Sequence, residues 1–186
     1  MLGVDANLIE KHYMDMAVVR KIVIKEQEDV MQIYAAAYYN MEHNVAVMLQ
    51  QLNVRQETVN LEAKIAAIQQ SSKVVLDELQ REAVCEAARN GLLIITGGPG
   101  TGKTTTINSI IRLYELEGLD FMLAAPTGRA AKRMSETTGY EARTIHRMLE
   151  LNGGMEGNAG FERNESNPLE TDAVIIDEMS MVDITL

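Results

Sequence analysis

The stretch IITGGPGTGKTTTI, residues 94–107, constrains this 186-residue chain more than any other feature. Its spacing, Gly97-x-x-x-x-Gly102-Lys103-Thr104, matches a phosphate-binding P-loop, and it lies between an apolar run and a segment with helical character. Glycines let backbone N–H groups wrap phosphates, and the following helix presents its positive end. Lys103 then places a charge near the β- and γ-phosphates, and Thr104 offers a hydroxyl to Mg²⁺. The pattern predicts a nucleoside triphosphate site.

The residues of this segment expected to hold the nucleotide are Gly98, Pro99, Gly100, Thr101, Gly102, Lys103, Thr104 and Thr105.

An acidic pair, Asp177–Glu178, follows the apolar run AVII. An Asp at the carboxyl end of a strand can hold Mg²⁺, and the adjacent Glu can orient or deprotonate the attacking water. A lone carboxylate at such a position is usually a solvated turn or a helix cap, but the P-loop favours the catalytic interpretation. We expect Lys103, Asp177 and Glu178 to be catalytic, with Asp177 and Thr104 as the metal ligands. An acid pair indicates hydrolysis rather than transfer to a second small substrate.

The first half of the chain is expected to be mainly helical. Its spacing predicts a helix within 4–19, two strands at 21–25 and 30–34 around a polar turn, an amphipathic helix at 35–52, and mostly helix over 53–90 with a break near 71–73.

The pattern changes at residue 91. Apolar runs at 92–96, 120–125 and 173–177 predict buried strands, alternating with helices at 104–118 and 128–139 and a short helix at 144–151. This alternation predicts an α/β fold with a parallel sheet, interrupted by a polar connector at 152–171.

Composition excludes several classes of protein. Hydrophobic residues make up 46%, and no apolar run approaches the roughly 18 residues of a membrane span. The first 30 residues carry no signal-peptide pattern, and the single Cys85 fits a reducing compartment, so we expect a cytoplasmic location without a membrane partner. We interpret Cys85 as a small apolar residue on a helix.

The net charge of −10 argues at first against a nucleic-acid partner. Residues 121–150, however, hold five Lys or Arg and three Asp or Glu, and this window contains PTGRAAKRM. Because charges are screened over about 8 Å at physiological salt, distant acidic residues need not cancel a local basic patch. Net charge therefore does not exclude nucleic acid.

Five motifs occur in order: DELQREAV (77–84), GGPGTGKTTTI (97–107), LAAPTGRAAKRMSETTG (123–139), ARTIHRML (142–149) and VIIDEMSMVD (174–183). Together they resemble the first half of the motor of RecD-like superfamily-one DNA helicases. The resemblance implies ATP as the nucleotide and 5′-to-3′ movement on single-stranded DNA, in repair or recombination. It also implies a RecA-like motor domain at 75–186, incomplete at its carboxyl end, after a mainly helical region at 1–74. For that region, a winged-helix-like end is one interpretation.

The resemblance also assigns roles to single residues. Gln80 resembles the glutamine that reads the adenine edge, and a carboxamide can both donate to and accept from adenine. The alternative is a surface glutamine on a helix. Thr127, Gly128 and Arg129 resemble the segment that contacts the DNA backbone, and His146 lies in another segment of that kind. For His146 a purely structural role remains open.

The resemblance implies a second RecA-like domain of the same protein as a partner, because such motors hydrolyse ATP between two domains. Nuclease-complex subunits are further partners that it suggests. This chain alone is expected to be an inactive fragment. Three rival interpretations stay open: the helicase part of a conjugative relaxase, a P-loop ATP-binding switch that does not translocate, and a truncated product with nucleotide affinity alone.

Overall fold

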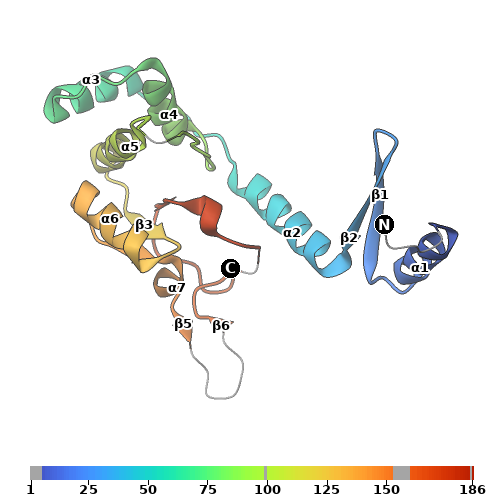
Figure 1. Ribbon diagram of the computed structural model, residues 1–186. Helices are drawn as coiled ribbons and strands as arrows, with labels where there is room; N and C mark the ends of the chain where they lie inside the picture. Colours follow the sequence, from blue (N-terminus) through green and yellow to red (C-terminus); the bar gives the residue numbers. More distant parts are fainter. Residues whose placement is uncertain (1–5, 99, 153–159, 185) are drawn as a thin grey trace. The chain divides into compact units, whose positions relative to one another are not determined.

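A computed structural model describes residues 6–98, 100–152, 160–184 and 186 (Figure 1). Its contacts divide the chain into two units, which are described separately. The amino-terminal unit is Met1–Asn53 with Ile184–Leu186, and the P-loop unit is Val54–Asp183.

The amino-terminal unit contains a helix, a β-hairpin and a second helix. Its elements are α1 (Ala6–Val18), β1 (Ile22–Gln27), β2 (Val30–Ala35) and α2 (Ala36–Leu52), and β1 pairs antiparallel with β2. Two residues, Glu28 and Asp29, form the turn with φ of 51° and 61°. Positive φ at both central residues matches the twist of a two-residue hairpin. The expected helices and hairpin of this region are confirmed.

Three helices of the P-loop unit share one hydrophobic core. They are α3 (Leu61–Ser72), α4 (Glu78–Arg89) and α5 (Lys103–Glu117). The core is built from Leu61, Ile65, Ile68, Leu76, Val84, Cys85, Ile110 and Leu113. The expected break near 71–73 is confirmed, because α3 ends at Ser72 and its C-cap, Lys73, has a left-handed φ of 54°. Cys85 is buried and free, as a small apolar residue on a helix would be.

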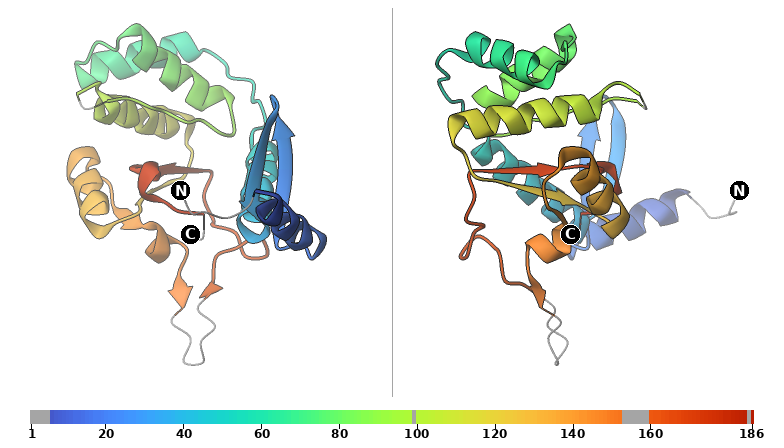
Figure 2. Two further views of the ribbon diagram at one scale, coloured as in Figure 1. Left: turned by 45° about the vertical axis from the view of Figure 1, so that its right-hand side comes forward. Right: turned by 90° about the vertical axis from the view of Figure 1, so that its left-hand side faces the viewer.

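A parallel three-stranded sheet forms the other layer of this unit (Figure 2). Its strands are β3 (Phe121–Ala125), β4 (Ala142–Thr144) and β7 (Ala173–Ile176), in the order β4-β3-β7. Two helices follow β3 and β4, namely α6 (Gly128–Thr138) and α7 (Ile145–Met148). Ile111 of α5, Leu123 of β3 and Met134 of α6 pack in one cluster, so both helices contact the same face of β3. The expected α/β architecture, a partial RecA-like parallel sheet with flanking helices, is confirmed.

Smaller elements complete the P-loop unit. Strands β5 (Leu151–Asn152) and β6 (Gly160–Phe161) pair antiparallel within the expected polar connector, of which residues 153–159 lie outside the described part. A short 3₁₀ helix spans Met179–Met181. Across the described residues, no helix combines the length and the apolar character that a membrane crossing would need.

One expectation about local structure was wrong, and one strand was not expected. Residues 92–96, all within the described part, form no strand, and the side chain of Ile94 is 74% exposed. An apolar run becomes a strand only where its backbone groups pair with a neighbour, and this run has no ladder partner among the described residues. Conversely, β4 was not expected as a strand. Its three residues are too short for a periodic signal, and pairing with β3 gives them their strand conformation.

The division between the two units lies at residue 53, whereas the sequence suggests a motor domain that begins at residue 75. The segment in between carries α3, which packs in the core of α4 and α5. The limits 1–74 and 75–186 stay a prediction about functional modules, as does the winged-helix interpretation.

Candidate functional site

The P-loop folds around the ammonium group of its own lysine. Lys103 Nζ donates to the carbonyl oxygens of Gly97 and Gly98 at 2.6 and 2.9 Å, and Thr101 Oγ1 also donates to Gly98 at 3.0 Å. Gly100 and Gly102 have φ of 78° and 77°, which L side chains rarely adopt. The loop thus curls back over Lys103. Pro99 lies outside the described residues.

Helix α5 begins directly after this loop, and its first backbone donors lie outside the hydrogen bonds of the helix itself. Its N-cap is Gly102, which has no capping side chain, and the first hydrogen bond across the cap runs from Thr106 N to Gly102 O at 3.0 Å. The N–H groups of Lys103, Thr104 and Thr105 therefore precede the helical ladder. Together with the helix dipole, they suit an anion such as a phosphate. The Thr104 side chain is exposed at this end.

Gln80 reaches the P-loop from the first turn of α4. Its Nε2 lies 3.5 Å from the carbonyl oxygen of Thr101, and a Cβ added to Gly102 would collide with it. The structure thus places Gln80 beside the loop expected to hold the nucleotide, although the two are about twenty residues apart in the sequence.

The acidic pair follows β7. Asp177 N donates to Ala124 O at 3.0 Å, which extends the β3–β7 ladder to the first acidic residue. Asp177 Oδ1 accepts from Glu178 N at 2.9 Å. Glu178 is exposed and has a φ of 56°, a left-handed conformation that is uncommon for residues other than glycine. This bend ends the strand and begins the 3₁₀ helix.

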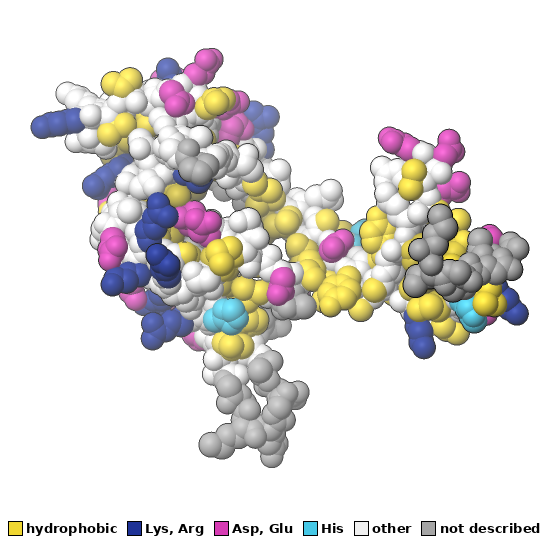
Figure 3. All heavy atoms as spheres, in the orientation of Figure 1, with side chains coloured by type: hydrophobic (Ala, Val, Ile, Leu, Met, Phe, Trp, Pro, Cys, Tyr) yellow, Lys and Arg dark blue, Asp and Glu magenta, His cyan; other side chains and the backbone are white. Residues whose placement is uncertain are grey.

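The residues expected to contact DNA follow the other two strands. Thr127 is the N-cap of α6, where its hydroxyl accepts from Ala130 N at 3.2 Å, and Gly128 and Arg129 are exposed at the same helix end. His146, in α7 after β4, is exposed, with its ring 6.0 Å from that of Phe161. Figure 3 shows Lys and Arg side chains gathered around α6, where Lys132 and Arg133 are also exposed.

The three parallel strands bring these groups to one edge. Strand β4 leads to His146, β3 leads to Thr127–Arg129, and β7 leads to Asp177–Glu178. We call this the carboxyl edge, after the carboxyl ends of β4, β3 and β7. Ligands of open α/β sheets bind outside the carboxyl ends of the strands. The carboxyl edge therefore combines an acidic pair with a hydroxyl, a helix N-terminus and basic side chains.

The donor set fits a magnesium ion held together with a nucleotide. Mg²⁺ is usually bound by one or two carboxylates plus substrate phosphates, and Asp177 and Thr104 offer the required oxygen atoms. Within the described part of the chain, no group of three or more His, Cys, Asp and Glu side chains could hold a metal by itself.

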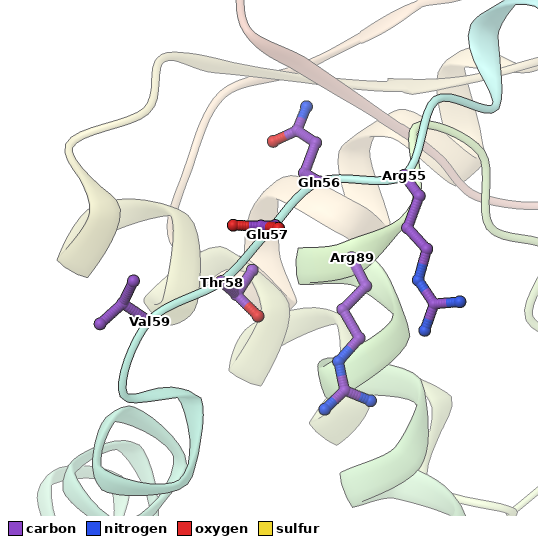
Figure 4. A pocket seen from close by; sticks show the side chains of 6 residues that line it. All are labelled: Arg55, Gln56, Glu57, Thr58, Val59 and Arg89. Carbon is purple, nitrogen blue, oxygen red and sulfur yellow. The ribbon is translucent and has the colours of Figure 1, made fainter.

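A surface depression lies away from these residues. It is lined by Arg55, Gln56, Glu57, Thr58, Val59 and Arg89, none of which is an expected site residue (Figure 4). The segment that leads to α3 forms one wall, and two backbone hydrogen bonds hold it against the end of α4, from Gln56 N to Arg89 O at 2.7 Å and from Gly91 N to Val54 O at 3.1 Å.

Sequence reasoning missed the contribution of Asp77. Its side chain caps α4 and pairs reciprocally with Gln80. The spacing Asp-x-x-Gln before an amphipathic helix is the signature of such a capping box and could have revealed it.

Known proteins similar to this chain include two that are named ATP-dependent DNA helicases and several that are named as the RecD subunit of the RecBCD enzyme. An ATP-dependent RecD2 DNA helicase of Deinococcus radiodurans is 40% identical over 116 residues, which cover 62% of this chain and 16% of that protein. The RecBCD enzyme subunit RecD of Mycolicibacterium smegmatis is 35% identical over 132 residues, or 59% of this chain and 24% of that subunit. The ATP-dependent DNA helicase dda of Enterobacteria phage T4 is 45% identical over 92 residues, 48% of this chain and 21% of its own length.

The chain thus spans less than a quarter of the length of each of these relatives. The resemblance to RecD-like helicases that the motifs suggest is confirmed. A family model described as AAA domain matches residues 80–186, more than half of the chain, and the chain therefore belongs to the AAA domain family.

Proposed function

We propose that this chain supplies the nucleotide-binding half of an ATP-dependent DNA helicase or translocase that moves 5′ to 3′ on single-stranded DNA. The second half of the catalytic cleft comes from a further RecA-like domain of the same protein. The work of the motor is DNA repair or recombination in the cytoplasm, alone or with nuclease-complex subunits. The names of the RecD2 and dda relatives support helicase activity, and the name of the RecD relative supports assembly into a complex.

The shared carboxyl edge carries this proposal. Asp177 is bonded through its backbone to Ala124, three residues before Thr127. A change in the position of the acidic pair, as ATP is hydrolysed, can therefore be transmitted through β3 to the residues assigned to DNA. A nucleotide switch without DNA movement would need no basic helix end on the same edge.

Each residue of the site has a separate chemical task in this proposal. Lys103 and the first N–H groups of α5 neutralise the phosphates, and Thr104 and Asp177 provide the oxygen ligands for Mg²⁺, which offsets the charge that develops on the phosphoryl group. Glu178 accepts a proton from the attacking water or orients it. Gln80 reads the adenine edge. Thr127, Gly128, Arg129 and His146 contact the DNA.

The decisive experiment measures ATP hydrolysis by the full-length protein with and without single-stranded DNA, beside its Glu178→Gln variant. The expected result is turnover that DNA stimulates and that the variant lacks while still binding ATP. Turnover that does not respond to DNA contradicts the motor and supports a switch. The 186-residue chain should bind nucleotide without turnover, because half of the cleft is elsewhere.

A further inference from the structure

Helix α2 of the amino-terminal unit has an uncovered apolar surface. Its 17 residues all lie in the described part of the chain, and none of them is buried. Its sequence holds a single Asp, Glu, Lys or Arg residue, Glu42. Figure 3 shows hydrophobic side chains along much of α2. The outward face of a surface helix normally carries charged residues, so an apolar face of this kind indicates a contact with another protein surface.

The β1–β2 hairpin packs against a different face of α2. The ring of Tyr39 lies 5.5 Å from the ring of Tyr34 in β2, and Lys25 Nζ of β1 lies 5.5 Å from the centroid of the Tyr39 ring. His43, one turn further along α2, is stacked on Tyr39 with a centroid distance of 6.4 Å. Because successive residues turn by about 100° around a helix, Val45 lies on the side of α2 away from Tyr39 and His43.

The face that contains Val45 has the spacing of a coiled-coil seam. Apolar side chains recur there at alternating intervals of three and four residues, as at the a and d positions of a heptad repeat. In such a seam each apolar side chain inserts between side chains of a facing helix. Four of the five side chains are exposed, and the other is half-buried. We call these five residues the α2 seam: Tyr38, Met41, Val45, Met48 and Leu52.

The residues that flank the α2 seam favour a second copy of this chain as the partner. Flanking positions of a coiled coil often carry the charges that select a different, oppositely charged partner. Here they hold Glu42, Asn44, Leu49 and Gln51, of which Glu42 alone is charged. Two identical seams can therefore meet without strong repulsion. Helices α3, α4, α5 and α6 already use their apolar faces in the two cores of the P-loop unit.

We propose that α2 is the contact helix of a homodimer, in which the α2 seam of one copy packs against the α2 seam of a second copy. A two-fold contact uses the same surface on both copies, which a nearly uncharged seam permits. The seam is about 20 Å long, which is short for a coiled coil. Association should therefore be reversible, with a dissociation constant on the order of 10–100 µM.

Two valines of α2 provide a matched pair of substitutions. Val45 and Val47 are 41% and 39% exposed, but two residues turn the helix by about 200°, so Val47 lies outside the seam. Val45→Lys places an unpaired ammonium group in the seam of each copy and should raise the dissociation constant at least about 10-fold. Val47→Lys adds the same charge outside the seam and should change it by less than about 2-fold.

Sedimentation equilibrium of the 186-residue chain and of both variants, over roughly 2–200 µM, measures these dissociation constants. The mass of the unsubstituted chain should rise from that of one copy toward that of two. A mass that stays at one copy overturns the proposal and leaves the seam to another part of the full-length protein. Equal dissociation constants for Val45→Lys and Val47→Lys overturn it as well, because the copies then meet elsewhere.

Amide hydrogen exchange of the unsubstituted chain tests the contact without relying on how the variants fold. The N–H groups of α2 should exchange more slowly at the high end of this concentration range than at the low end. Those of α5, in the P-loop unit, should exchange at the same rate at both. If the chain associates and exchange in α2 does not respond to concentration, α2 is not the contact helix.

Discussion

The ammonium group of Lys103 lies 2.6 Å from the carbonyl oxygen of Gly97, so the lysine of the P-loop is bonded to the loop itself. A carbonyl oxygen carries only a partial negative charge, and a phosphate oxygen is a stronger acceptor for an ammonium group. The bond keeps the ammonium group of Lys103 at the loop, where it can exchange the carbonyl oxygen of Gly97 for a phosphate oxygen of the nucleotide.

Replacing Lys103 by Ala should weaken binding of Mg-ATP by about 10- to 100-fold, since hydrogen bonds to charged groups contribute about 1.5–3 kcal/mol. Titration calorimetry on the 186-residue chain measures this directly. Lys11→Ala, which removes an exposed lysine of α1, is the matched control for the loss of one charge. Equal affinities for Lys103→Ala and the unsubstituted chain would remove Lys103 from the site.

Gly102→Ala should destabilise the P-loop unit. At a φ of 77° an L side chain costs about 1–2 kcal/mol, and the added Cβ would also collide with Gln80 Nε2. Gly98→Ala is the control, because its φ is not positive and a Cβ there meets nothing within 4 Å. Urea unfolding of both variants measures the difference. If the two variants unfold at the same urea concentration, the loop does not have this backbone conformation.

Motifs and apolar periodicity identified the P-loop, the acidic pair and the strands at Phe121–Ala125 and Ala173–Ile176, because each of these is local in sequence. The run at 92–96 was misjudged because pairing with another strand decides whether an apolar run becomes a strand. The contact between Gln80 and Thr101 depends on how α4 packs against α5, which no local pattern records. The left-handed backbone of Glu178 likewise has no signal in the residue itself.

Replacing Thr127 should lower the stability of the fold, whereas replacing Arg129 should weaken DNA binding. Thr127→Ala removes the cap of α6 and should lower the free energy of unfolding by about 1 kcal/mol, whereas Thr127→Ser keeps the hydroxyl and the stability. Arg129→Ala should leave stability unchanged and weaken single-stranded DNA binding across sequences. The logarithm of the association constant falls linearly with the logarithm of the salt concentration, and removing one phosphate contact should make this slope less steep by about 0.7.

Fluorescence anisotropy at several salt concentrations measures the effect of Arg129→Ala on DNA binding by the full-length protein. Arg112→Ala, which removes an arginine of α5 that pairs with Glu115 at 2.8 Å, is the control for the loss of one positive charge. An unchanged salt slope in Arg129→Ala would show that Arg129 does not contact the DNA backbone.

Glu115 should make the stability of the P-loop unit depend on pH. Partial burial raises the pKa of its carboxyl group, but hydrogen bonds from Tyr140 and Arg112 outweigh that effect and hold the pKa below the usual 4.5. A carboxyl group whose pKa is lower in the folded state stabilises the fold above its unfolded pKa. That contribution is complete above about pH 4.5 and is lost as the pH falls through the folded pKa.

Glu115→Gln removes this contribution, so the difference in unfolding free energy between the unsubstituted chain and the variant should be larger at pH 7 than at about pH 3. Urea unfolding at both pH values measures it. Glu136→Gln is the control on the exposed face of α6, where the distance to Lys132 is 3.9 Å and an ion pair contributes little. A Glu115→Gln effect of the same size at both pH values would mean that the carboxylate is not held by Tyr140 and Arg112 in solution.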